Sequence, residues 1–136
     1  MRVFLTALAV GAGSARVPYV QELFHAHDYR IPRGQYRIPS LVSTKNGTLL
    51  AFVAARLHCT DMTPNIIYTR RSVNDGNTWA EQQVVVADWT NETEYGGVPV
   101  VDKQSGAIHY LFNAAARKNG RCSACELLPK LDLTPS

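Results

Sequence analysis

Two arginines and an aspartate, Arg37, Arg56 and Asp61, have side chains that could bind and process an acidic ligand. Arg56 follows Arg37 by 19 residues, and Asp61 comes five residues later. A guanidinium group can hold a carboxylate through two parallel hydrogen bonds. A carboxyl group with a raised pKa can donate a proton and later accept one. Each of the three could equally be a solvated surface or loop residue, so the case for chemistry depends on the elements that carry them.

The residues around these three side chains predict a β-rich segment. We expect strands over 38–43, 48–55, 65–71 and 83–87, which together would form one four-stranded meander. Asn46-Gly47 predicts a tight hairpin turn between the first two strands. The second strand is apolar on both faces, which is typical of a strand buried between packed sheets. The polar residues 57–64 predict a loop, and this loop carries Asp61.

In this order and spacing, the features resemble the exo-sialidase (neuraminidase) family, whose catalytic domain is a six-bladed β-propeller. The resemblance covers about residues 24–113, and its most specific parts are Tyr36-Arg37-Ile38-Pro39, the spacing from Arg56 to Asp61, and the turn from Ser72 to Trp79. It implies an all-β fold class. Because a propeller blade takes about 40–50 residues, the chain would hold about one and a half blades of the six-bladed sialidase propeller, an incomplete ring.

The resemblance also implies roles for the three side chains. Arg37 would be one of three arginines that clamp the carboxylate of sialic acid, Arg56 would line the sugar pocket, and Asp61 would be the catalytic acid and base. Tyr29-Arg-Ile-Pro32 repeats the motif, but no strand–turn–strand pattern follows it, so the family role falls to Arg37. The family's tyrosine nucleophile, its glutamate partner and the other two clamp arginines lie beyond the matched region. No cofactor or metal is expected.

The turn Ser72-Val-Asn-Asp-Gly-Asn-Thr-Trp79 resembles the aspartate box of the same family, a structural device remote from the pocket. In the family its carboxylate accepts turn N–H groups, its glycine takes a positive φ, and its tryptophan packs under the blade. Asn74 stands at the aspartate position, and its side-chain oxygen can still accept those hydrogen bonds. Ser72, Asn74, Gly76 and Trp79 are therefore predicted to be structural.

A second, less complete meander is predicted from strands over 98–101 and 107–112. Gly96-Gly97 lies where the family often has an asparagine, which puts a pocket contact from that position in doubt. Strand signals stop after Ala114, so we divide the chain into a propeller part, 16–113, and an unmatched tail, 114–136. Within the propeller part, residues 16–33 show no sustained period and predict no regular element.

The first 15 residues predict a secretory signal peptide, because Arg2 is followed by an apolar run and then by small residues. An ordinary buried strand or the start of a helix would explain the same residues. A signal peptide implies a secreted or lumenal protein, including a lysosomal one. No run approaches the roughly 20 apolar residues that span a bilayer. The net charge of +3 is spread along the chain, which argues against a nucleic-acid partner.

Cysteine and histidine spacing gives no metal site. Cys122-Ser-Ala-Cys125 is a lone C-x-x-C, and no second pair of cysteines or histidines stands at the spacing of zinc ligands.

The sequence therefore predicts part of an exo-α-sialidase, a glycosidase that removes terminal sialic acid from glycoproteins, glycolipids or oligosaccharides. With one clamp arginine and no matched nucleophile, these 136 residues are expected to be inactive alone and prone to aggregate. A lectin-like module that binds sialic acid would keep Arg37 and not need Asp61. A non-enzymatic aspartate-box propeller for protein contacts, similar to sorting-receptor domains, would need none of the three site residues.

Overall fold

Nine strands form three antiparallel sheets in the described part of the computed structural model, which comprises residues 3–7, 19–25, 35–58, 63–87, 93–118 and 121–132. The first sheet pairs β1 (Val3–Ala7) with β2 (Tyr19–Phe24). The second contains β3 (Gln35–Ser43), β4 (Leu49–Arg56), β5 (Asn65–Ser72) and β6 (Gln83–Val86) in sequence order. The third contains β7 (Thr93–Val101), β8 (Ile108–Lys118) and β9 (Arg121–Asp132). The all-β fold class predicted from the sequence is confirmed.

The four-stranded sheet is the meander predicted from the sequence. Its four strands match the predicted ones within three residues at each end. The turn between β3 and β4 is closed by backbone bonds from Thr44 N to Thr48 O at 2.8 Å and from Gly47 N to Thr44 O at 3.0 Å. Gly47 has a φ of +80°, which a glycine adopts without steric cost.

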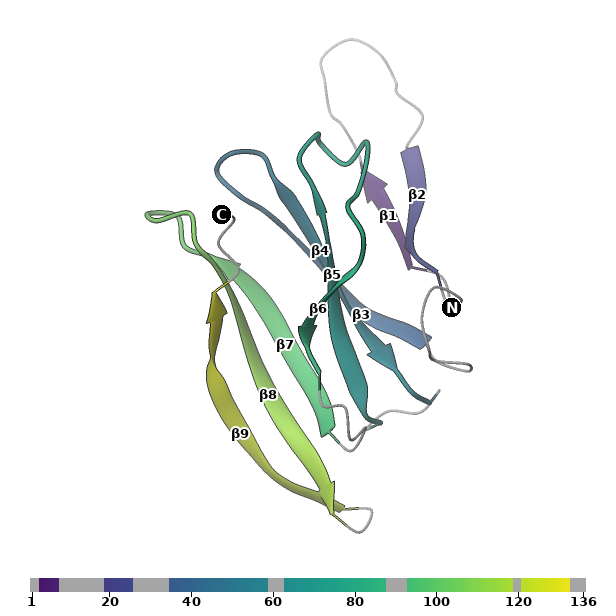
Figure 1. Cartoon of the computed structure of the whole chain (residues 1–136), viewed down its shortest axis with the longest axis vertical. Coiled ribbons are helices and arrows are strands. Elements are labelled where there is room, and N and C mark those ends of the chain that lie inside the picture. Colours follow the sequence, from purple (N-terminus) through teal and green to yellow (C-terminus); the bar gives the residue numbers. More distant parts are fainter. Residues whose placement is uncertain are drawn as a thin grey trace.

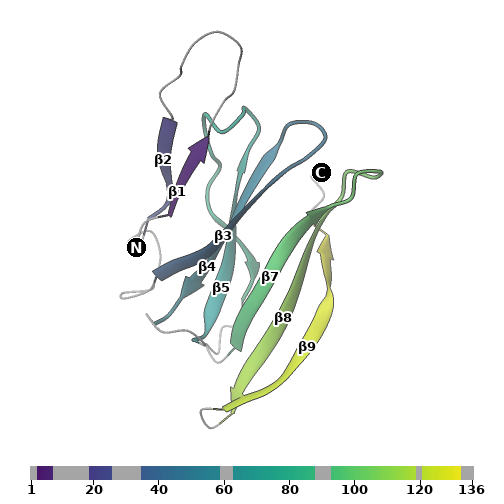
Figure 2. The same ribbon diagram turned by 180° about the vertical axis from the view of Figure 1, so that it is seen from behind.

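β4 is the centre of the packing, because its residues 50–56 are buried on both faces of the sheet. Ala51 and Val53 pack in a cluster that includes Phe24 of β2. Leu50 and Phe52 point to the other face, in a cluster that includes β7 and β8. The ring of Phe52 stacks on that of Tyr110 with centroids 5.2 Å apart. Figures 1 and 2 accordingly show the four-stranded sheet between the other two. The predicted burial of this strand on both faces is confirmed.

The C-terminal part departs from the prediction. β8 runs on to Lys118, and β9 pairs with it from His109↔Asp132 to Lys118↔Arg121. The expectation that strands end near Ala114 is therefore wrong. β9 lies at the edge of its sheet, where backbone pairing with one neighbour holds it, and such a strand does not require apolar alternation. Pro129 is compatible with this position because an edge strand can leave one N–H side unpaired.

The N-terminal part also contains a strand that the sequence did not predict. β2 lies inside 16–33, and its residues Leu23 and Phe24 are 3% and 1% exposed in the core. β1 falls within the predicted signal peptide and pairs antiparallel with β2. The structure thus gives Val3–Ala7 the strand conformation that was the alternative explanation, while the leader itself stays a prediction.

Candidate functional site

Strand register brings Arg37 and Arg56 together at one end of the four-stranded sheet. Arg37 of β3 lies opposite Ala54, and Arg56 of β4 lies opposite Gln35. Residues two apart on a strand share a face, so both arginines lie on the face of the sheet that also carries Ala54. Diagonal neighbours of this kind are about 7–8 Å apart. Two guanidinium groups from positions 19 apart in the sequence are therefore neighbours on one surface.

A β-bulge next to Arg37 sets how this part of β3 meets β4. The register advances three residues on β3, from Arg37 to Ser40, for only two on β4. Ile38 and Pro39 together lie opposite one residue of β4, and Ile38 has a φ of +55°. Positive φ is unfavourable for a β-branched residue and costs about 1–3 kcal/mol. Bulges re-aim side chains and increase local twist. Ile38 and Pro39 therefore form a strained bulge directly after Arg37.

Arg56 is buried, with 6% of its surface exposed, and a polar bridge lies beside it. Its partner across the sheet on β5 is Asn65. The Asn65 amide donates to Tyr95 O at 2.9 Å and accepts from Tyr95 N at 2.8 Å. These two bonds connect the start of β7 to the start of β5, which pairs with the end of β4. The sequence analysis missed Asn65, because an asparagine at a predicted strand start resembles an ordinary turn residue.

Asp61 lies outside the described residues, but the two ends of its loop are placed. The backbone N–H of Leu57 donates to Pro64 O at 3.1 Å, immediately beyond the paired residues Arg56 and Asn65. The loop therefore leaves and rejoins the sheet at the end that carries Arg37 and Arg56. Arg37 and Arg56 thus lie at one end of one sheet, and the described ends of the predicted Asp61 loop lie at the same end.

Gly96 and Gly97 contribute backbone but no side chain near this end. A Cβ on Gly97 would lie 2.6 Å from Tyr110 Cε1 and 2.7 Å from Leu111 O. Gly96 N donates to Asn113 Oδ1 at 3.1 Å, across the β7–β8 pair. At position 97, the close packing of β7 on β8 leaves no room for a side chain larger than that of glycine.

The turn from Ser72 to Trp79 lies at the opposite end of the sheet. Asn74 Oδ1 accepts from Thr78 N at 2.9 Å and from the Ser72 hydroxyl at 3.1 Å. Ser72 Oγ in turn accepts from Gly76 N at 2.9 Å. Gly76 has a φ of +83°, and Trp79 Nε1 donates to its carbonyl at 3.0 Å. An asparagine at position 74 thus satisfies the turn in the way expected from its amide oxygen.

Tyr110 in the core does not have the properties of an activated nucleophile. Burial raises the pKa of Tyr110 to about 12, which keeps its phenol protonated and unreactive. Tyr68 and Tyr95 are also buried, at 2% and 8% exposure. The sequence assigned a catalytic role to none of them.

With this geometry in place, comparison with known proteins gives a consistent result. No family model matches the chain. A sialidase of Micromonospora viridifaciens is 39% identical over 89 residues. This chain is similar to part of a sialidase. The match covers 62% of the chain but only 14% of the relative, so the chain spans a small part of the relative's length.

Two further features of the described residues bear on partners. They contain no group of three or more histidine, cysteine, aspartate or glutamate side chains that could hold a metal ion. They also contain no helix of the length and hydropathy needed to cross a bilayer.

Proposed function

We propose that this chain is part of an exo-α-sialidase, a retaining glycosidase that hydrolyses terminal sialic acid from glycoproteins, glycolipids or oligosaccharides. The observation that carries the proposal is the strand register that puts Arg37 and Arg56 on one face, at the end of the sheet where the Asp61 loop begins and ends. Similarity to a sialidase over 89 residues supports it. In this assignment the four-stranded sheet is one blade of a β-propeller, the three-stranded sheet is part of another, and the turn from Ser72 to Trp79 is an aspartate box.

Each of the three side chains has a physical reason for its role. Sialic acid carries a carboxylate on its anomeric carbon, and the Arg37 guanidinium would hold it through paired charge-assisted hydrogen bonds. Arg56 is held in place by its burial and would line the sugar pocket. Asp61 would protonate the leaving oxygen and later activate water. The site also needs a tyrosine nucleophile, which sialidases use in place of a carboxylate. Because these 136 residues supply no matched nucleophile, we expect them to have no activity alone.

A chimera tests the proposal directly. The matched segment of this chain would replace the corresponding segment of the Micromonospora sialidase, and hydrolysis of a fluorogenic sialoside would be measured. We expect turnover, a fall in kcat of about 10²–10⁴-fold in the Asp61→Asn chimera, and a rise in KM with Arg37→Lys, because an ammonium cannot make the bidentate contact.

Lys103→Met serves as a matched charge-removal control on an exposed turn, and its kinetics should equal those of the parent chimera. A folded chimera that binds a sialoside without hydrolysing it would instead indicate a lectin-like module. A folded chimera that neither binds nor hydrolyses would reject both assignments.

A further inference from the structure

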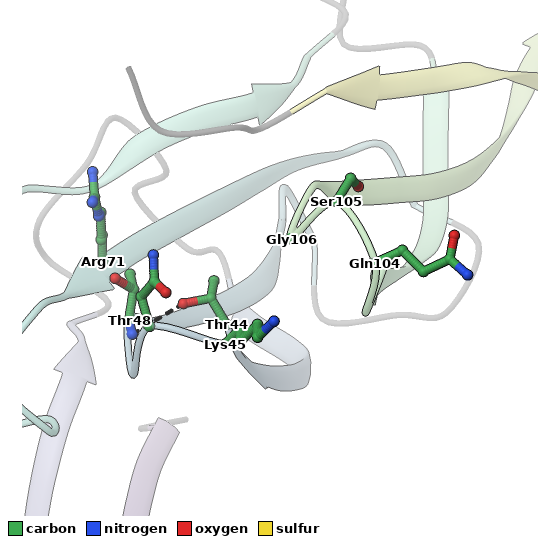
Figure 3. A pocket seen from close by; sticks show the side chains of 8 residues that line it. Thr44, Lys45, Thr48, Arg71, Gln104, Ser105 and Gly106 are labelled. Carbon is green, nitrogen blue, oxygen red and sulfur yellow. Dashed lines mark hydrogen bonds between the residues drawn. The ribbon is translucent and has the colours of Figure 1, made fainter.

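A cleft lies at the end of the four-stranded sheet that is remote from Arg37 and Arg56. It has a volume of about 500 Å³ and is lined by the β3–β4 turn, by Arg71 of β5 and by residues 104–106 of the β7–β8 turn. Figure 3 shows the two turns beside each other, with Arg71 on the neighbouring strand. The full length of β4 separates this cleft from Arg56, a distance of about 20 Å at the rise of a β-strand. A ligand here would therefore not occupy the candidate sugar site.

The cleft carries positive charge that nothing in the described part neutralises. Lys45 and Arg71 line it, both side chains are exposed, and neither makes an ion pair with a described residue. No aspartate or glutamate is among its lining residues. Two cations facing one cleft repel each other weakly, and an anion between them removes that repulsion.

The nearest carboxylate on the β7–β8 turn, Asp102, is already engaged within its own turn. Its oxygens accept from the Ser105 hydroxyl at 2.6 Å and from Gln104 N at 2.8 Å. The bond from Ser105, followed by that from Gln104, lowers the pKa of the Asp102 carboxyl. This carboxylate therefore stabilises the turn, is not among the residues that line the cleft, and makes no ion pair with Lys45 or Arg71.

The remaining polar groups of the cleft lie on hydrogen-bonded turns, and several of them can donate a hydrogen bond to a ligand. Thr44 Oγ1 accepts from Thr48 N at 3.1 Å, which leaves the Thr44 hydroxyl hydrogen available to a ligand. Asn46 and Gln104 also line the cleft and offer amide N–H groups. Backbone bonds fix both turns, including Gly106 N to Asp102 O at 2.8 Å. A rigid wall of donors with two cations and no aromatic side chain suits a small oxyanion better than a neutral sugar ring.

We propose that this cleft binds an anionic oxygen group, a sulfate, phosphate or carboxylate, through Lys45 and Arg71. The site is separate from the candidate sialic acid site and its test does not depend on glycosidase activity. It gives the end of the molecule opposite the sugar site a binding function for acidic ligands.

The test measures thermal unfolding of the whole chain by tryptophan fluorescence at low micromolar protein, with sodium sulfate replacing sodium chloride at constant ionic strength. Binding to the folded state raises the midpoint with the logarithm of the sulfate concentration once that concentration exceeds the dissociation constant. We expect Arg71→Met and Lys45→Met each to weaken the apparent sulfate affinity about tenfold or more, because each removes a charge-assisted contact.

Lys103→Met is the matched control, since it removes one exposed positive charge from the β7–β8 turn outside the cleft lining, and its sulfate response should equal that of the wild type. Parallel titrations with phosphate and acetate show which oxyanion the cleft prefers. Sulfate also stabilises folded proteins by exclusion from their surfaces. A rise in the midpoint that is equal in the wild type and in every variant at each sulfate concentration would therefore overturn the proposal. If Arg71→Met does not fold, Arg71→Gln replaces it in the same comparison.

Discussion

The four-stranded and three-stranded sheets differ in how many of their faces are covered. In the four-stranded sheet, residues 50–56 of β4 are all 7% exposed or less, because β2 packs on one face and β7 and β8 pack on the other. One face of the three-stranded sheet packs on Leu50 and Phe52 of β4. On its other face, Val98, Val100 and Leu111 are 57%, 42% and 44% exposed. A strand with two apolar faces requires cover on both sides. The four-stranded sheet is covered on both faces by described residues, and the described part of the three-stranded sheet is covered on one face only.

The interface between the four-stranded and three-stranded sheets should contribute most to stability, and Phe52→Ala tests this most directly. Phe52 is 1% exposed and stacks on Tyr110 across the interface. Its truncation leaves a cavity between the sheets and should lower the free energy of unfolding by about 3–5 kcal/mol. Urea denaturation followed by tryptophan fluorescence measures the change. Val98→Ala on the uncovered face is the control and should stay within about 0.5 kcal/mol. Equal losses in the two variants would contradict the contrast between the faces.

Adjacent glycines give a second contrast, this time within β7. Gly97→Ala forces a Cβ against Tyr110 Cε1 at 2.6 Å and Leu111 O at 2.7 Å, and should cost about 1–3 kcal/mol. Gly96→Ala meets only the Asn113 side chain at under 3 Å, which can rotate away. The same urea measurement should therefore show the smaller loss for Gly96→Ala. The opposite order would mean that β7 and β8 are not packed as closely as their register implies.

Alkaline pH should weaken the interface through Tyr110. Burial raises its pKa to about 12, from an ordinary value of 10, so the unfolded chain loses this proton first. The contribution is fully present below pH 10 and is lost as pH rises toward 12, to a limit of about 2 kcal/mol. Stability measured between pH 9 and 12 should fall less steeply in Tyr110→Phe than in wild type. Identical slopes would show that the Tyr110 phenol is not desolvated.

The sequence predicted those elements whose signals are local. The four strands of the central sheet follow from apolar runs and the Asn46-Gly47 turn, whereas the position of Arg37 and Arg56 at one end came from the strand register in the structure. β9 was missed because an edge strand held by backbone pairing leaves no alternation. Asn65 was missed because its role depends on Tyr95, 30 positions away, which only the packing of two sheets brings near. The cleft with Lys45 and Arg71 combines two turns that are distant in sequence, so no single stretch signals it.

The smallest expected effect on stability belongs to the uncovered face, yet its effect on solubility should be large. Val98 and Leu111 lie opposite each other on β7 and β8 and form an exposed apolar pair. Replacing both with threonine keeps β propensity and should change the free energy of unfolding by less than about 0.5 kcal/mol per site. We expect light scattering to show less aggregation of the double variant than of the wild type, because exposed apolar sheet surface promotes self-association. Val20→Thr with Val73→Thr removes two exposed valines outside this sheet as the control. If both doubles reduce aggregation equally, general surface hydrophobicity drives self-association and the uncovered sheet face has no special part in it.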